Sequence, residues 1–183
     1  SGDNNEGQLG DGTQTDRNVP VQILSSGVQA ISAGYRHSLI LKTDGSLWAM
    51  GYNFAGELGD GTKVQRNSPV QIISGGVKAV SAGFYYSLIV KTDGSLWAMG
   101  DNGSGNFGDG STTSQLSPVQ VLSSGVQAVA AGKRHSLILK TDGSLYATGY
   151  NGYGQLGDGT TVNHSTPVLI LAGGVRKVAA GVD

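Results

Sequence analysis

The stretch Leu58-Gly59-Asp60-Gly61-Thr62 returns three more times, with few changes, at intervals of 49 residues. Ala-Gly pairs recur at the same interval, with no insertion or deletion between copies. A fixed period of this length indicates repeated supersecondary units, each of which needs its neighbours to bury its faces. We therefore interpret residues 1–183 as a single domain that contains a partial repeat (1–33), three whole repeats (34–82, 83–131 and 132–180) and a stub (181–183).

The composition favours a loop-rich β protein over a helical solenoid. Glycine supplies 31 of the 183 residues and charged residues only 14%. The net charge is −1 and there is no basic cluster, so we expect neither a nucleic-acid partner nor an anionic membrane surface. No stretch approaches the roughly 18 consecutive apolar residues of a membrane span, so we expect no membrane insertion. The absence of cysteine removes the usual indicator of compartment.

Each repeat contains four short strand-like runs. In the second whole copy and its lead-in they span residues 77–82, 86–91, 95–99 and 118–122. Asp93-Gly94 between the second and third runs predicts an antiparallel hairpin with a type I′ turn. Pro118 opens the fourth run, and because proline lacks an amide donor, we expect this strand to begin with the proline and to lie at the outer edge of the sheet.

A repeated four-stranded antiparallel meander of about 45 to 50 residues is typical of a β-propeller blade. A β-trefoil is the competing geometry, but it would close after three repeats and leave the remaining residues unexplained. The predicted fold class is therefore all-β: a β-propeller made of four-stranded antiparallel blades with 49-residue repeats, forming a partial ring of three whole blades plus end strands.

The repeat also resembles that of a known family. Ala-Gly-x-x-His-Ser-Leu at 33–39 and 131–137, and Asn-x-x-Gly-x-Leu-Gly at 53–59 and 151–157, are similar to the repeat of the regulator of chromosome condensation family. The resemblance covers the whole chain in register and implies a seven-bladed propeller, of which this chain would form roughly half. Members of that family act in nucleotide exchange on a small GTPase, in chromatin docking and as scaffolds. Because one fold can carry many functions, the resemblance does not choose among these roles.

Differences between the copies within this chain are concentrated in two connections of each blade. The first follows the Ala-Gly pair, and the second joins the third strand to the fourth. In an up-and-down sheet both connections emerge at the same end, so the variable loops should share one face of the propeller. Loops on a rigid scaffold commonly carry binding function, and aromatic residues with arginine dominate binding hot spots. The expected partner-binding residues are Tyr35, Arg36, Tyr52, Phe54, Phe84, Tyr85, Lys133, Arg134 and Tyr153.

Other residues that could carry chemistry have adequate structural explanations. The aspartates of the Asp-Gly and Gly-Asp-Gly turns stabilise turns, so we expect no catalytic residues. His37 and His135 are replaced by Tyr86 in the middle copy, which disfavours a repeated metal site and favours packing or hydrogen bonding. Trp48, Trp97 and Tyr146 occupy equivalent positions, where large rings suit the packing of one blade on the next. We expect no metal and no cofactor, and we interpret the chain as a non-enzyme.

Two functions from different classes remain. We favour a protein-interaction module whose variable loop face docks another protein. The alternative is a glycan-binding, lectin-like surface module that uses the same Tyr and Phe rings. A guanine nucleotide exchange factor is less favoured, because the strict 49-residue spacing leaves no room for the inserted wedge that such factors use.

Two further expectations concern the ends of the array and its location. Uncovered end blades would expose apolar faces, so further propeller segments or a second copy of the chain should cover them. Low charge with abundant Gly, Ser, Thr and Asn favours an extracellular or cell-surface setting over a cytoplasmic one.

Overall fold

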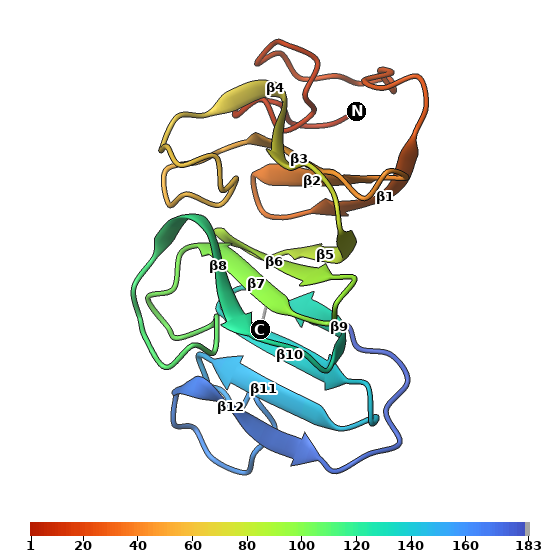
Figure 1. Cartoon of the computed structure of the whole chain (residues 1–183). Coiled ribbons are helices and arrows are strands. Elements are labelled where there is room, and N and C mark those ends of the chain that lie inside the picture. Colours follow the sequence, from red (N-terminus) through yellow and green to blue (C-terminus); the bar gives the residue numbers. More distant parts are fainter. Residues whose placement is uncertain (182–183) are drawn as a thin grey trace.

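A computed structural model of the chain describes residues 1–181 as a stack of three β-sheets (Figure 1). Each sheet is an antiparallel meander of four strands, and the described residues contain no helix. The first sheet comprises β1 (Val28–Ala33), β2 (His37–Lys42), β3 (Leu47–Gly51) and β4 (Arg66–Ile73). The second comprises β5 (Val77–Ala82), β6 (Tyr86–Lys91), β7 (Leu96–Gly100) and β8 (Gln115–Leu122). The third comprises β9 (Val126–Ala131), β10 (His135–Lys140), β11 (Leu145–Gly149) and β12 (His164–Leu171).

Each sheet is one blade, and the first strand of each following blade packs against the first and second strands of the preceding one. β1 contacts β5 and β5 contacts β9, whereas β4, β8 and β12 lie at the opposite edges of their sheets. The prediction of four-stranded antiparallel propeller blades, with the fourth strand at an edge, is confirmed. The expected ranges 77–82 and 86–91 match β5 and β6 residue for residue.

The fourth strand begins earlier than the sequence indicated. β8 starts at Gln115, so Pro118 is its fourth residue and not its first. The ladder is irregular at this point, because the pairing passes from Ala98 opposite Val119 to Gly100 opposite Gln115. A residue without an amide donor is tolerated at such a bulge, which explains why proline can lie inside an edge strand.

The Asp-Gly hairpin forms, but the predicted type I′ turn is wrong. That turn needs a positive φ at both central residues, whereas every positive φ in residues 1–181 belongs to glycine. Gly94 has φ 79° and donates its N–H to the carbonyl of Lys91 at 3.0 Å. This is a type I turn followed by a left-handed glycine bulge. The Asp93 carboxylate holds the turn by accepting hydrogen bonds from the Ser95 N–H at 2.8 Å and the Ser95 hydroxyl at 2.6 Å.

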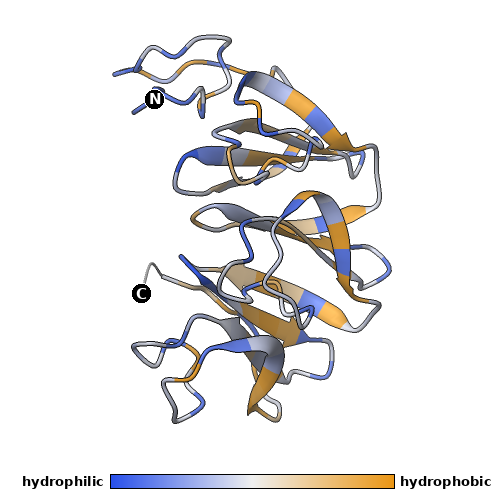
Figure 2. Ribbon diagram, turned by 90° about the vertical axis from the view of Figure 1, so that its left-hand side faces the viewer, coloured by the Kyte–Doolittle hydropathy of each residue, from blue (hydrophilic) through white to orange (hydrophobic). Residues whose placement is uncertain are grey.

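The hydrophobic core lies between the blades and not within any single sheet. One cluster joins the first and second blades through residues such as Leu39, Leu47 and Ile89, and a second joins the second and third blades. Trp97 packs against the first cluster and Tyr146 against the second, as the blade-packing interpretation predicted. Hydrophobic residues accordingly concentrate on the stacked strands and hydrophilic ones in the loops (Figure 2).

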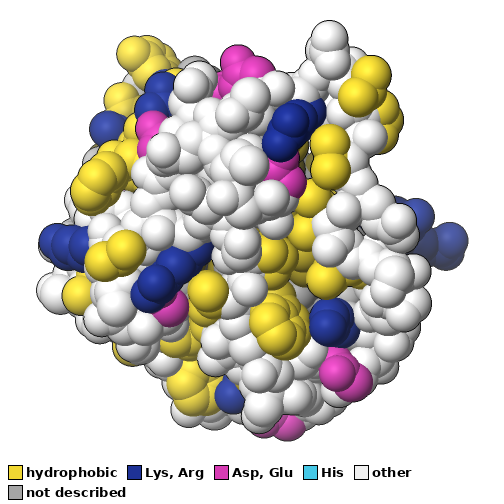
Figure 3. All heavy atoms as spheres, turned by 90° about the horizontal axis from the view of Figure 1, so that it is seen from above, with side chains coloured by type: hydrophobic (Ala, Val, Ile, Leu, Met, Phe, Trp, Pro, Cys, Tyr) yellow, Lys and Arg dark blue, Asp and Glu magenta, His cyan; other side chains and the backbone are white. Residues whose placement is uncertain are grey.

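The segments that flank the three sheets form no further blade. Residues 20–24 and 175–180 correspond by the repeat to a fourth and a first strand, yet neither is paired as a strand. At the first blade this leaves a groove with a volume of about 260 Å³, in which Ile31 is 77% exposed. Figure 3, seen from above, shows hydrophobic side chains gathered in a hollow at this end. We call it the end-face groove; it is lined by Gln8, Leu9, Ile23, Leu24, Val28, Ile31, Ser38, Leu39, Ile40 and Met50.

Hydrogen bonds place the loops of each blade on two opposite faces. Tyr52 N–H donates to the Arg36 carbonyl at 2.9 Å, which ties the two variable connections of the first blade together. At the other end, Thr92 N–H donates to the Gly76 carbonyl, and Val77 N–H donates to Gly45 of the preceding blade. The predicted division into a variable face and a near-constant face is therefore present in the structure.

Candidate functional site

The variable loops are held in shape by one buried asparagine in each copy. The Asn53 side-chain amide donates to the Asp60 carboxylate at 2.9 Å and to two backbone carbonyls, and its Oδ1 accepts from Leu58 N–H at 3.0 Å. Asn4, Asn102 and Asn151 make the equivalent bonds and are likewise buried. In the sequence these asparagines are recognisable only as part of a motif, and the constant seven-residue spacing from Asn to Asp is the signal for their role.

On this scaffold, five aromatic side chains form one continuous surface group. Tyr35 and Phe84 are stacked with ring centroids 4.0 Å apart and an interplanar angle of 10°. Tyr85 contacts both of these rings and also Tyr52, whose ring meets that of Phe54 at 4.8 Å. We call Tyr35, Tyr52, Phe54, Phe84 and Tyr85 the aromatic cluster. Its rings come from the loops of two neighbouring blades, so only the blade packing brings them together.

Two cations flank the stacked pair at the centre of the aromatic cluster. The Arg36 guanidinium lies 5.1 Å from the Tyr35 ring centroid, and the Lys133 ammonium lies 5.6 Å from that of Phe84. Both distances allow an attractive cation–π interaction. Arg36 also pairs with Glu6 at 3.1 Å, whereas no carboxylate lies within ion-pair distance of Lys133 in residues 1–181.

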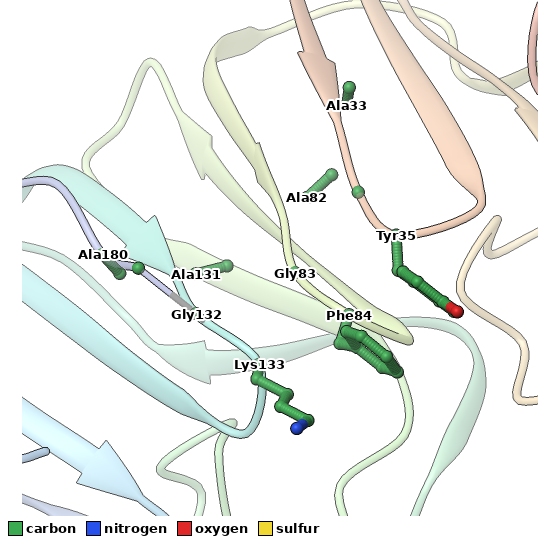
Figure 4. Close-up of a pocket in the computed structure, with 11 residues that line it drawn as sticks. Ala33, Tyr35, Ala82, Gly83, Phe84, Ala131, Gly132, Lys133 and Ala180 are labelled. Carbon is green, nitrogen blue, oxygen red and sulfur yellow. The ribbon is translucent and has the colours of Figure 1, made fainter. Parts of the chain in front are cut away.

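The stacked pair stands at the rim of a cavity with a volume of about 280 Å³, where the Ala-Gly pairs of all four copies converge. Figure 4 shows Tyr35, Phe84 and Lys133 around it, each the first residue after its Ala-Gly pair. We call this space the Ala-Gly cavity. Its remaining walls are Ala33, Gly34, Ala82, Gly83, Ala131, Gly132, Ala180 and Gly181. The walls are therefore small and apolar, and Lys133 is the one charged residue that lines them.

Seven of the nine predicted partner-binding residues belong to this arrangement and two do not. Arg134 is exposed next to Lys133, but its side chain has no ion pair or ring contact within the part of the chain that the structure describes. Tyr153 is 80% exposed and contacts Tyr150, with ring centroids 6.1 Å apart, away from the aromatic cluster. Both residues lie on the variable face, in loops of the third blade.

A buried carboxyl group on the same loop as Tyr52 and Phe54 was not singled out from the sequence. Glu57 is fully buried, its Oε2 accepts the Ala55 N–H at 2.9 Å, and its Oε1 has no hydrogen-bond partner in the described residues. Burial raises the pKa of Glu57 to about 7, and nearby Asp101 acts in the same direction. Gln8, Asn106 and Gln155 occupy the equivalent positions, so the one carboxyl group among four copies was the available signal.

The histidines and aspartates have the structural roles that the sequence favoured. His37 is buried and its Nε2 lies 2.9 Å from the Ser87 hydroxyl of the next blade. Burial lowers the pKa of His37 to about 4, so the ring is neutral at pH 7. Tyr86 at the equivalent position bonds to the carbonyl of His135 and, at 2.9 Å, to the Ser136 hydroxyl. His164, at the start of β12, lies 2.9 Å from the Asp158 carboxylate.

Residues 1–181 contain no group of three or more His, Cys, Asp or Glu side chains arranged to hold a metal ion. The same residues include no helix that is long and apolar enough to cross a membrane.

The fold agrees with several solved propellers. Prp20p from Saccharomyces cerevisiae superposes with a TM-score of 0.73 at 20% identity over 85% of this chain, and human WBSCR16 with 0.71 at 20% over 98%. Yeast RCC1 (Prp20), in a complex with Kap60, gives 0.71 at 22% over 79%. The alignments span 42%, 64% and 37% of those chains, respectively. A comparison with curated proteins found no significant match.

The repeat model of the regulator of chromosome condensation (RCC1) matches residues 1–41, 44–90, 93–139 and 142–183. A second model of the same repeat matches residues 28–57, 77–106 and 126–155. These matches confirm the resemblance drawn from the motifs and extend over nearly the whole chain. The chain therefore belongs to the RCC1 repeat family.

Proposed function

We propose that this chain is a non-enzymatic protein-interaction module that docks another protein on the variable face of its blades. The observation that carries the proposal is the aromatic cluster, in which rings from two blades and two flanking cations form one surface. Tyr35 and Phe54 remain 49% and 59% exposed. Exposed rings accompanied by arginine are typical of binding hot spots.

The relatives support a protein partner in general terms. The Prp20p structure was described with binding to Gsp1p and histones, and yeast RCC1 (Prp20) was solved bound to Kap60. At these identities the likeness establishes the fold, so we carry over only the expectation that a protein is the partner. The partner of this chain would be selected by its own loop residues.

The geometry favours a protein over a glycan as the ligand. A lectin site needs an open ring face on which a sugar can stack. In the Tyr35–Phe84 pair each ring covers one face of the other, and Arg36 and Lys133 lie over their rings. A nucleotide-exchange role receives no support from the loops, because every copy keeps the 49-residue spacing without an inserted wedge.

Selection of a random peptide library displayed on phage would test the proposal. The library is passed over the immobilised chain and over a variant with Tyr35→Ala, Phe84→Ala and Tyr85→Ala. We expect peptides enriched on the wild type to lose binding to the triple variant and to keep binding to Tyr153→Ala, a ring on the same face outside the cluster. Circular dichroism confirms that the variants fold. Absence of enrichment, or equal binding to the triple variant, would refute the proposal.

A further inference from the structure

Of the two cations beside the stacked pair, Lys133 lines the Ala-Gly cavity and Arg36 does not. Three successive copies place Tyr35, Phe84 and Lys133 at the same position after the Ala-Gly pair, so one copy substitutes a charge for a ring. Lys133 lies over Phe84 and has no carboxylate partner in residues 1–181. An ammonium group in this position offers its remaining hydrogen-bond donors to a ligand.

Arg36, at the other end of the stacked pair, shows which kind of group can pair with a cation that also contacts a ring. Arg36 lies over Tyr35 and pairs with the carboxylate of Glu6, and the two side chains are 41% and 19% exposed. The cation there touches a ring and a carboxylate at once. An acidic side chain from a partner, placed against Lys133, would reproduce the same arrangement on the other side of the stacked pair.

The cavity beside Lys133 suits a side chain better than a free small molecule. Its volume of about 280 Å³ is just below the roughly 300 to 1,000 Å³ of typical small-molecule sites. Its alanine and glycine walls present no side chain with a hydrogen-bonding group. An apolar side chain could pack there against the alanine methyl groups and the glycine carbons, because the larger part of the lining surface is apolar.

We propose that the partner presents an acidic segment: one carboxylate pairs with Lys133 at the rim, while an adjacent apolar side chain of the same segment enters the Ala-Gly cavity. This inference rests on the proposed function and specifies its ligand chemistry. Single-stranded nucleic acid is the competing ligand, because it also combines negative charge with stacking. A peptide can place an apolar side chain in the Ala-Gly cavity directly beside its carboxylate, which a nucleic-acid strand cannot do, so the cavity favours a peptide over a polyphosphate.

Fluorescence anisotropy with defined probes tests this assignment. The probe is a fluorescein-labelled peptide, Gly-Ser-Asp-Glu-Leu-Glu-Asp-Ser-Gly. The comparators are the same peptide with Asn and Gln replacing the acids, the same peptide with Lys replacing them, and oligothymidine. We expect the acidic peptide to bind at least about 5-fold more tightly than the neutral one at low salt, with the difference shrinking as salt screens the pair.

Two substitutions and one control locate the interaction. Lys133→Gln should weaken the acidic peptide by about 5- to 10-fold and leave the neutral peptide unchanged, and Lys133→Glu should transfer the preference to the lysine peptide. Lys78→Gln removes an exposed cation at the start of β5, near the opposite face, and should have no effect.

The outcomes separate this inference from the proposed function. Equal binding of acidic and neutral peptides, with both lost in Phe84→Ala, would overturn the acidic preference while supporting the peptide-binding face. Tighter binding of oligothymidine, or equal losses from Lys133→Gln and Lys78→Gln, would also overturn it. Failure of every peptide, both here and in the library selection, would refute the two proposals together.

Discussion

Glu57 is a loop residue whose chemistry conflicts with its surroundings. Gln8 and Gln155 make the same side-chain bond, accepting the N–H two residues earlier, with a neutral amide. Glu57 makes this bond with a carboxyl group that is fully buried and has one oxygen without a partner. A buried carboxylate without a cation is costly, so the folded loop favours the protonated form.

We therefore predict a stability that falls with rising pH and that depends on Glu57. Its folded-state pKa of about 7 lies above the ordinary 4.5, so the folded state holds the proton more tightly than the unfolded chain. The stabilisation is complete below about pH 4.5 and is lost as the pH rises through about 7. Glu57→Gln should raise the free energy of unfolding at about pH 8 by about 1 to 3 kcal/mol, at roughly 1.4 kcal/mol per pKa unit.

Urea unfolding of both proteins across this pH range provides the measurement. The two curves should converge towards about pH 4.5, because Glu57 is then protonated in both states. Glu6→Gln, a matched change at a partly exposed carboxylate on the preceding repeat, should not remove the pH dependence. A pH profile that is unchanged in Glu57→Gln would contradict the assignment.

At the scale of the element, the hairpin between β6 and β7 shows how a correct strand prediction can accompany a wrong turn. Asp-Gly fits both a type I′ turn and a type I turn with a glycine bulge. The deciding feature is Ser95, whose N–H and hydroxyl both bond to the Asp93 carboxylate and whose oxygen accepts from the Trp97 indole at 2.9 Å. These bonds hold Asp93 in an ordinary right-handed conformation.

Asp93→Gly distinguishes the two turns by the sign of its effect. A type I′ turn would accept glycine at this position, whereas the observed turn loses two hydrogen bonds and gains flexibility in the unfolded chain. We expect a loss of about 1 to 2 kcal/mol in the free energy of unfolding, measured with urea. Asp93→Asn, which keeps the accepting oxygen, should stay close to the wild type. Unchanged or increased stability in Asp93→Gly would contradict the type I assignment and support a type I′ turn.

The bond between the second and third blades offers a second test at this scale. The buried Tyr86 hydroxyl reaches the His135 carbonyl and the Ser136 hydroxyl of β10. Tyr86→Phe should lower the free energy of unfolding by about 1 to 2 kcal/mol, because these buried groups lose a partner. Tyr146→Phe, a half-buried ring of the third blade, is the matched control and should change little. Equal effects of the two substitutions in thermal unfolding would contradict this role.

The sequence predicts the elements better than it predicts the site. Short apolar runs and a fixed period define β5 and β6, because strand formation here follows local pattern. Which rings touch depends on how two blades pack, so the sequence could place Tyr35 and Phe84 on one face but could not predict their stacking. Glu57 was missed for a similar reason. Gln and Glu have similar size and shape, and only burial in the folded chain makes the carboxyl group much more costly than the neutral amide.

At the scale of the whole molecule, the end-face groove predicts association. Ile31 is 77% exposed within an apolar hollow, and large exposed apolar patches mark interaction sites. We expect the average mass in solution to rise with concentration above the 18.7 kDa of one chain, as measured by light scattering during gel filtration. Ile31→Glu should return the mass towards that of one chain. Val64→Glu, at a valine that is 57% exposed in a variable loop, should not; a concentration-independent monomer would refute the prediction.

The bonds that join the blades also determine how the molecule should come apart. His37 reaches Ser87 and Tyr86 reaches Ser136, each 50 residues further along, so coupling passes only from one blade to the next. A linear array coupled in this way opens from its ends, and its local stability is greatest where a unit has two neighbours. The amides of β6 and β7 should therefore exchange with solvent most slowly. A duplicated 49-residue copy would lengthen the array and move this protected region without breaking any of the bonds that hold it.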